Sequence, residues 1–179
     1  RAVRIGGEGS PAMSTKMDLI HIPTLGNASD FGDLTIDRNG TTGASSSTRG
    51  FAFGGISPGK VNSIECFELQ SLGNPFDFGD LSAARSNMGS GHSSTTRALC
   101  FAGLEDSGPF VNKIEYITMA TVGNVTDFGD ATASIANHCG TGSITRAVMG
   151  GGMTPDPSNI IDYVTIASTG DATDFGDLS

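Results

Sequence analysis

The sequence has little positive charge, no tryptophan and no long apolar run. Lysine and arginine together number only 10 among 179 residues, and the net charge is −9. Because phosphate binding needs clustered Lys and Arg, we expect no nucleic-acid partner. No stretch approaches the length of a membrane-spanning helix, so we also expect no membrane insertion. From these absences we therefore expect neither nucleic acids nor membranes as partners.

Cysteine and histidine are too scattered to indicate a metal or redox centre. No CxxC motif is present, and an odd number of cysteines is poor evidence for a disulfide framework or a zinc site. We interpret the cysteines as small core or near-core residues. No nucleophile elbow, HExxH motif or phosphate loop occurs, so we predict no catalytic residue, no metal and no cofactor. The residues concerned are Cys66, Cys100 and Cys139, with His21, His92 and His138.

The sequence does contain one tetrapeptide, Asp-Phe-Gly-Asp, four times. Successive copies start 47, 50 and 47 residues apart, and a Gly-Asn or Gly-Asp pair precedes each copy by two residues. A regular period of this size indicates a repeat array. The recurring residues are Asp30, Phe31, Asp33, Asp77, Phe78, Asp80, Asp127, Phe128, Asp130, Asp174, Phe175 and Asp177.

An arginine runs in step with the tetrapeptide. The repeat arginines Arg1, Arg49, Arg97 and Arg146 are spaced 48, 48 and 49 residues apart. Together the two landmarks predict a single array of repeats over approximately residues 1–48, 49–96, 97–145 and 146–179, the last one incomplete.

Each repeat has the pattern of four short strands. In the third repeat Arg97–Gly103 is an apolar run ending in glycine, and Ile114–Met119 alternates polar with β-branched or aromatic residues. Both patterns predict strands. The Asp-Phe-Gly-Asp segment predicts a short edge strand anchored by its phenylalanine. A Ser/Gly-rich stretch, such as Ser82–Ser94, predicts a fourth strand, whose small residues let strands converge around a central axis.

Surface loops of variable length connect the first strand of each repeat to the second. They carry Gly, Pro, Ser and scattered charges, and Pro11 is the proline of the first. With 26 glycines and no convincing helix, the chain is predicted to be all-β. The loops are Glu8–Lys16, Ile56–Asn62, Leu104–Asn112 and Met153–Asn159.

Four strands in a unit of this length are typical of a β-propeller blade, and the pattern resembles the kelch family. In that family a strand with an arginine leads to an apolar strand ending Gly-Gly, then to strands with a tyrosine and a bulky aromatic. The resemblance implies a kelch-like β-propeller with four-stranded antiparallel blades, of which four repeats are visible in a larger propeller. The matching residues are Arg38 and Arg85, Gly54-Gly55 and Gly151-Gly152, and Tyr116 and Tyr163; the departures are Ile135, Leu19, Cys66 and phenylalanine in place of tryptophan.

The wording of the fourth repeat, from Ile161 to Ser179, resembles kelch-like repeats in structural proteins of aquatic bacteriophages, cyanophages especially. That resemblance implies a virion protein exposed on a tail, a fibre or the capsid. The array lacks one Ser/Gly-rich strand of a complete set of four. We therefore expect either a larger propeller or a closing strand supplied by another chain.

The repeated aspartates have a structural and a metal-binding interpretation. Asn27, Asp30 and Asp33 could offer oxygen ligands to calcium. Alternatively, the aspartates cap turns or pair with the repeat arginines, for instance Asp33 with Arg49, which we favour. The magnesium-binding Asp-Phe-Gly of protein kinases is excluded, since a kinase needs one copy together with a glycine-rich loop and a strand lysine.

Two classes of function follow. The first, which we favour, is a non-enzymatic virion structural or adhesion module that binds other virion proteins, copies of itself or host-surface glycans. The second is a sugar-active or oxidase-type enzyme on the same fold; a bacterial surface or scaffold repeat protein is a third alternative. An enzyme would concentrate carboxylates, histidines or a metal at one end of the propeller. The composition of the variable loops favours binding.

Overall fold

The computed structural model describes residues 1–9, 12–106 and 108–179, and every helix-or-strand element in these residues is a strand. The prediction of an all-β protein is therefore confirmed. The predicted loop proline Pro11 lies outside the described residues.

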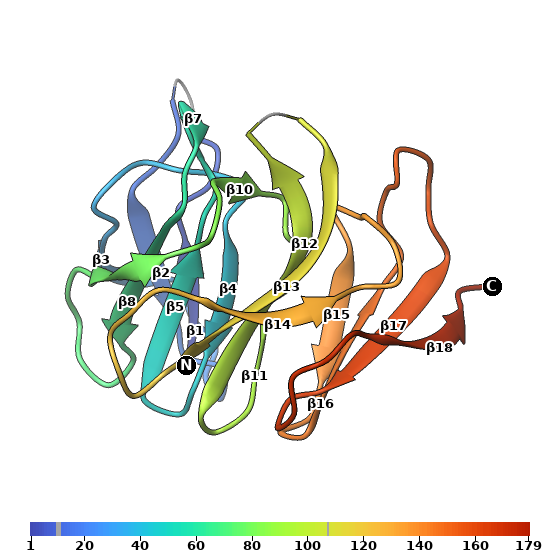
Figure 1. The fold of residues 1–179 in the computed structure, drawn as a ribbon. Helices are drawn as coiled ribbons and strands as arrows, with labels where there is room; N and C mark the ends of the chain where they lie inside the picture. Colours follow the sequence, from blue (N-terminus) through green and yellow to red (C-terminus); the bar gives the residue numbers. More distant parts are fainter. Residues whose placement is uncertain (10–11, 107) are drawn as a thin grey trace.

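Four antiparallel sheets stand side by side in chain order, from the blue N-terminal sheet to the red C-terminal sheet (Figure 1). The first contains β1 (Ala2–Ile5), β2 (Lys16–Ile20) and β3 (Ser29–Asp33). The second contains β4 (Thr42–Ser45), β5 (Arg49–Phe53), β8 (Ser63–Glu68) and β9 (Phe76–Asp80). The third contains β10 (Arg85–Ser86), β11 (His92–Ser93), β12 (Arg97–Glu105), β13 (Phe110–Thr118) and β14 (Thr126–Asp130). The fourth contains β15 (Cys139–Gly142), β16 (Arg146–Gly150), β17 (Ile160–Thr165) and β18 (Thr173–Asp177), and a small hairpin, β6 (Ile56–Ser57) with β7 (Gly59–Lys60), follows β5.

The sheets are offset from the sequence repeats by one strand. The Ser/Gly-rich strand β4 belongs to the first repeat, yet it pairs with β5 of the second, from Thr42 opposite Phe53 to Ser45 opposite Gly50. A tight turn causes this pairing, because the Ser46 hydroxyl oxygen accepts the backbone N–H of Arg49 at 3.0 Å. Sequence reasoning placed four strands in each unit. The structure instead builds a sheet from parts of two repeats, which joins neighbouring repeats covalently and by hydrogen bonds.

Asp-Phe-Gly-Asp forms the outer edge strand of every sheet, as its short length predicts. Each copy contains a bulge: the pairing of β8 with β9 passes from Ile64–Gly79 to Glu65–Asp77 and skips Phe78. A bulge re-aims the side chain of the extra residue. Here it turns Phe78 into the core, where its ring meets Phe51 edge-on with 5.2 Å between ring centroids.

The opposite edges of the last three sheets meet one another. Strand β11 contacts both β4 and β15. The Ser93 hydroxyl donates to the Ser45 carbonyl, and the Thr42 hydroxyl donates to the Gly89 carbonyl. Small side chains permit this approach. The sheets remain open and form no closed ring within the described residues, so the kelch-like propeller stays a prediction.

The apolar core is divided into three layers, one between each pair of successive sheets. Phe31 packs with Phe67 in the first layer, and Phe128 packs with Val164 and Ile166 in the last. Each sheet is therefore stabilised mainly by its neighbours along the chain.

The same motif position supplies a matched pair of core and surface phenylalanines. Phe78 is fully buried, whereas Phe175 is 58% exposed. We expect Phe78→Ala to lower the free energy of unfolding by about 3–5 kcal/mol, because it leaves a cavity. Phe175→Ala should cost less than about 1 kcal/mol. Urea unfolding followed by circular dichroism measures both; equal losses would contradict the layered core.

Candidate functional site

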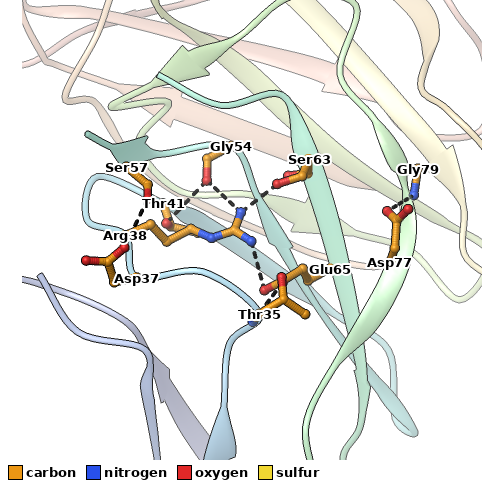
Figure 2. A network of polar contacts seen from close by, with 10 residues as sticks. All are labelled: Thr35, Asp37, Arg38, Thr41, Gly54, Ser57, Ser63, Glu65, Asp77 and Gly79. Atoms are coloured by element: carbon orange, nitrogen blue, oxygen red, sulfur yellow. Dashed lines mark hydrogen bonds and ion pairs between the residues drawn. The ribbon is translucent and has the colours of Figure 1, made fainter. Parts of the chain in front are cut away.

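A buried acid on the second strand of a repeat contacts residues of the preceding repeat. Figure 2 shows the first example, Glu65 on β8. One of its carboxylate oxygens lies 2.8 Å from the Arg38 guanidinium, and the other accepts the backbone N–H of Thr35 at 3.0 Å. Both charged side chains are almost completely buried. Since a buried charge is tolerated only when it is paired, this contact constrains how the two sheets align.

The arginine of this pair makes further hydrogen bonds to the backbone. Arg38 also donates to the carbonyls of Gly54 at 3.0 Å and Ser63 at 3.4 Å. Burial lowers the pKa of Arg38, and the neighbouring Glu65 carboxylate opposes that shift. The next junction repeats the arrangement, with Arg85 paired to Glu115 and donating to two backbone carbonyls.

The third junction keeps the acid and loses the arginine. Ile135 stands where an arginine is expected, and the acid there is the shorter Asp162. Its carboxylate accepts the backbone N–H of Thr132 at 2.9 Å and the Thr132 hydroxyl at 2.8 Å. Sequence reasoning identified Arg38, Arg85 and Ile135 but treated the acids only as alternating polar residues. The recurrence of an acid at the same position of the second strand in each repeat could have indicated these contacts.

The predicted pairing of Asp33 with Arg49 is wrong. Asp33 lies opposite Lys16 in the β2–β3 register, and their charged groups are 3.0 Å apart. This contact lowers the pKa of the Asp33 carboxyl and raises that of Lys16. Arg49 instead pairs with Glu68 at 2.9 Å, its own cross-strand neighbour on β8.

The repeat arginines nevertheless connect sheets, through backbone carbonyls. Arg49 donates to the Met119 carbonyl at 3.1 Å, and Arg1 and Arg97 do the same to Leu69 at 2.7 Å and Ile166 at 2.9 Å. Each acceptor lies one sheet further along the chain. The guanidinium carbons of Arg97 and Arg146 also lie 4.5 Å from the centroids of the Tyr116 and Tyr163 rings.

The tetrapeptide and the Gly-Asn pair recur together because they bind each other across sheets. Asn74 accepts the backbone N–H of Asp33 at 2.9 Å, and the Gly73 N–H donates to the Phe31 carbonyl at 2.9 Å. At Gly32, with φ of +151°, a Cβ would lie 2.7 Å from the Gly73 carbonyl oxygen, so no side chain fits. The same bonds recur from Asp80 to Asn124 and from Asp130 to Asp171, both at 3.0 Å.

This geometry gives the Asn and Asp residues a structural role at each such junction. At these junctions the residue equivalent to Asn27 accepts a backbone N–H of the preceding tetrapeptide, as the Asn74 side chain does from Asp33. The repeat aspartates Asp30, Asp77, Asp127 and Asp174 lie on the outer edge strands. No group of three or more His, Cys, Asp or Glu side chains suited to a metal ion occurs within residues 1–9, 12–106 and 108–179.

Two histidines lie in the interior and the third does not. His92 and His138 are buried beside Phe101, with ring centroids 5.5 and 6.4 Å from it, whereas His21 is exposed. Burial lowers the pKa of both interior imidazoles to about 4, and their mutual repulsion adds to the shift for His138. Both are therefore neutral at physiological pH.

The cysteines divide in the same way. Cys66 and Cys100 lie in the core, as predicted, and burial raises the pKa of each thiol to about 12. The prediction for Cys139 is wrong, because this residue is exposed. It lies on β15 in a hollow with Val148, Ile161 and Leu178 on the outer face of the last sheet. The equivalent residue of the second sheet, Thr42, is buried under the third.

Two equivalent grooves run between neighbouring sheets at the end where the hairpins turn. Each is lined by serine and threonine hydroxyls and one repeat arginine, and Thr95 lies between them and lines both. The first groove contains Ser46, Thr48, Arg49, Glu68 and Thr95, and the second contains Ser94, Thr95, Thr96, Arg97, Thr145 and Thr165. The pattern Ser-x-Thr-Arg in each hairpin places these hydroxyls, since the serine accepts the arginine N–H and closes the turn.

Comparison of the chain with models of known protein families and with curated proteins finds no match. The resemblance to kelch repeats and to phage structural proteins therefore stays a hypothesis. In the part of the chain that the structure describes, no helix is long and apolar enough to cross a membrane.

The buried ion pairs are predicted to matter more than the exposed one at the equivalent position. Glu115→Gln leaves the buried Arg85 without a counter-charge and should lower the free energy of unfolding by about 3–5 kcal/mol. Asp18→Asn removes the partner of Arg4 from an exposed pair and should cost less than about 1 kcal/mol. Chemical denaturation measures both, and the double variant Arg85→Met/Glu115→Leu should recover most of the loss.

The buried imidazoles predict a loss of stability in mild acid. Because folding lowers their pKa from 6.5 to about 4, their contribution is complete above pH 6.5 and is lost as the pH falls toward 4. Each imidazole contributes on the order of 3 kcal/mol to this dependence. Urea midpoints measured from pH 7 to pH 4.5 should fall steeply for the natural chain. They should fall less for His92→Gln/His138→Gln.

Proposed function

We propose that this chain is a non-enzymatic virion structural or adhesion module, with its four sheets serving as blades of a kelch-like β-propeller. Three features support the propeller: the sheets follow in chain order, the Ser/Gly-rich edges of the last three sheets converge, and each of these three sheets takes its first strand from the preceding repeat. The virion setting rests on the resemblance of the fourth repeat to phage structural proteins.

The observation that carries the binding role is the pair of equivalent grooves. Their hydroxyl and guanidinium groups are donors that suit the oxygens of a sugar. Because the grooves belong to successive repeats, one extended glycan with repeating units can contact both at once. Two weak contacts on one ligand raise the overall affinity through effective concentration. A host-surface polysaccharide is the ligand class that this arrangement fits best.

The variable loops lie at the opposite end of the sheets, between the first and second strands of each repeat. They differ in length and sequence, whereas the hairpins beside the grooves share one pattern. We assign the loops to contacts with other virion proteins, since each loop presents a different surface. This division leaves one end of the module for the particle and the other for the host.

The test is binding of the purified chain to arrayed bacterial capsular and O-antigen oligosaccharides. Thr95→Trp fills both grooves and should weaken binding by roughly tenfold or more, about 1.4 kcal/mol. Asn159→Trp, in an exposed loop of the fourth repeat, is the matched control and should bind as the natural chain does.

Two results would contradict the proposal. Absence of binding to every oligosaccharide would remove the adhesion role. Shortening or oxidation of a bound oligosaccharide, detected by mass spectrometry, would show a sugar-active or oxidase-type enzyme instead.

A further inference from the structure

Three junctions join the four successive sheets of this molecule. Each junction consists of one face from the earlier sheet and one face from the later sheet. The outward faces of the first and fourth sheets have the same types of residue and are not covered. We define the leading face as the outward side of the first sheet, with Asp18, Ile20, Ile22, Gly26 and Asn27. We define the trailing face as the outward side of the fourth sheet, with Cys139, Arg146, Phe175, Leu178 and the backbone of Gly176 and Asp177.

The trailing face exposes side chains that are buried at every other junction. Phe175 is 58% exposed, whereas the three equivalent phenylalanines of the other copies are buried. Leu178 is 49% exposed, whereas its counterparts Leu34 and Leu81 are buried. With Val148 and Ile161, Leu178 lines the apolar hollow that also contains Cys139.

The leading face exposes the complementary set. Ile20 is 46% exposed, although its counterpart Phe67 is buried against Phe31 of the preceding sheet, with ring centroids 5.5 Å apart. Ile22 is 70% exposed, although its counterpart Met119 is buried. Each face thus presents the half of the junction that the other face lacks.

The backbone of the two faces is complementary as well. At the internal junctions the glycine of the tetrapeptide touches the Gly-Asn turn of the next sheet, as Gly32 touches Gly73. At Gly176 no heavy atom lies within 4 Å of a Cβ position, whereas the other three tetrapeptide glycines touch the turn of the next sheet. Gly73, Gly123 and Gly170 each donate a backbone N–H to the phenylalanine carbonyl of the preceding tetrapeptide, and within the described residues Gly26 makes no such bond. A tetrapeptide without a turn and a turn without a tetrapeptide therefore lie on opposite faces of one chain.

We propose that a second copy of this chain covers the trailing face with its leading face, head to tail, and reproduces the internal junction. Phe175 packs against Ile20 of the second copy, and the Phe175 carbonyl accepts its Gly26 N–H. The Asn27 side chain accepts the Asp177 N–H, and Arg146 donates to the Ile22 carbonyl. The occupant follows from continuity with the existing junctions, because these contacts require this repeat pattern and the chain itself carries both halves.

Such a contact is heterologous, so it closes into a ring or grows into a filament according to its rotation angle. Each chain carries a charge of −9, which opposes association at low ionic strength. We therefore expect the assembly to strengthen as salt is added. The contact is independent of the proposed virion role, since it depends only on the two faces.

The experiment is sedimentation velocity of the 179-residue chain over a range of concentrations and salt. We expect species at multiples of 18.3 kDa. Phe175→Glu disables the trailing face and Ile20→Glu disables the leading face. Both side chains are exposed, so folding should be retained, and circular dichroism checks this. Each variant alone should be monomeric, and an equimolar mixture should form a dimer of one chain of each kind and nothing larger.

A control and a second readout keep the test specific. Leu72→Glu alters an exposed aliphatic residue that belongs to neither face and should leave the assembly unchanged. Labelling of Cys139 by a thiol reagent should continue in the assembly, because the counterpart Thr42 is covered by Gly89 of the Ser/Gly-rich stretch before β12 and the first sheet has no such stretch. A natural chain that stays monomeric throughout, or an assembly that survives both face substitutions, would overturn the proposal.

Discussion

Buried carboxylates bind each of the last three sheets to the repeat before it, and this constraint governs how the sheets align. Glu65 and Glu115 each meet an arginine that is itself completely buried. A shift of one sheet against the next would leave two charges in an apolar layer without partners, which costs far more than any single apolar contact contributes. Where the arginine is replaced by Ile135, Asp162 meets the neutral donors of Thr132 instead.

The inner and outer edge strands of the sheets make different contacts. Glycine and serine on the inner strands let β4, β11 and β15 approach one another. On the outer edge the bulge at Phe78 sends an aromatic ring into the core and leaves the glycine against the next turn. Because these contacts stabilise the scaffold from inside, the loops between the first and second strands of each repeat are free to vary in length and sequence. That freedom suits a binding module, in which the scaffold is constant and the surface differs between partners.

The local pattern was sufficient to predict most of the strands. Arg97–Gly103 and Ile114–Met119 correspond to β12 and β13, since apolar runs and alternation reflect burial within a single strand. The local pattern was not sufficient to predict which charged residues pair with each other. Asp33 and Arg49 recur in step, yet each pairs with its own cross-strand neighbour. Recurrence at one period shows that two residues have fixed roles, but it does not show that they meet.

The sequence by itself determined the period, most strand positions and the all-β class, because these depend on residues close together in the chain. Tertiary structure decided the rest. The arginine contacts join residues 68 to 70 positions apart, and the offset of sheets from repeats decides which strand each arginine faces. It also decided that Phe175 and Cys139 are exposed while Phe78 and Thr42, at the same repeat positions, are buried. Burial at a junction depends on whether a neighbouring sheet covers the residue, and no pattern within one repeat contains that information.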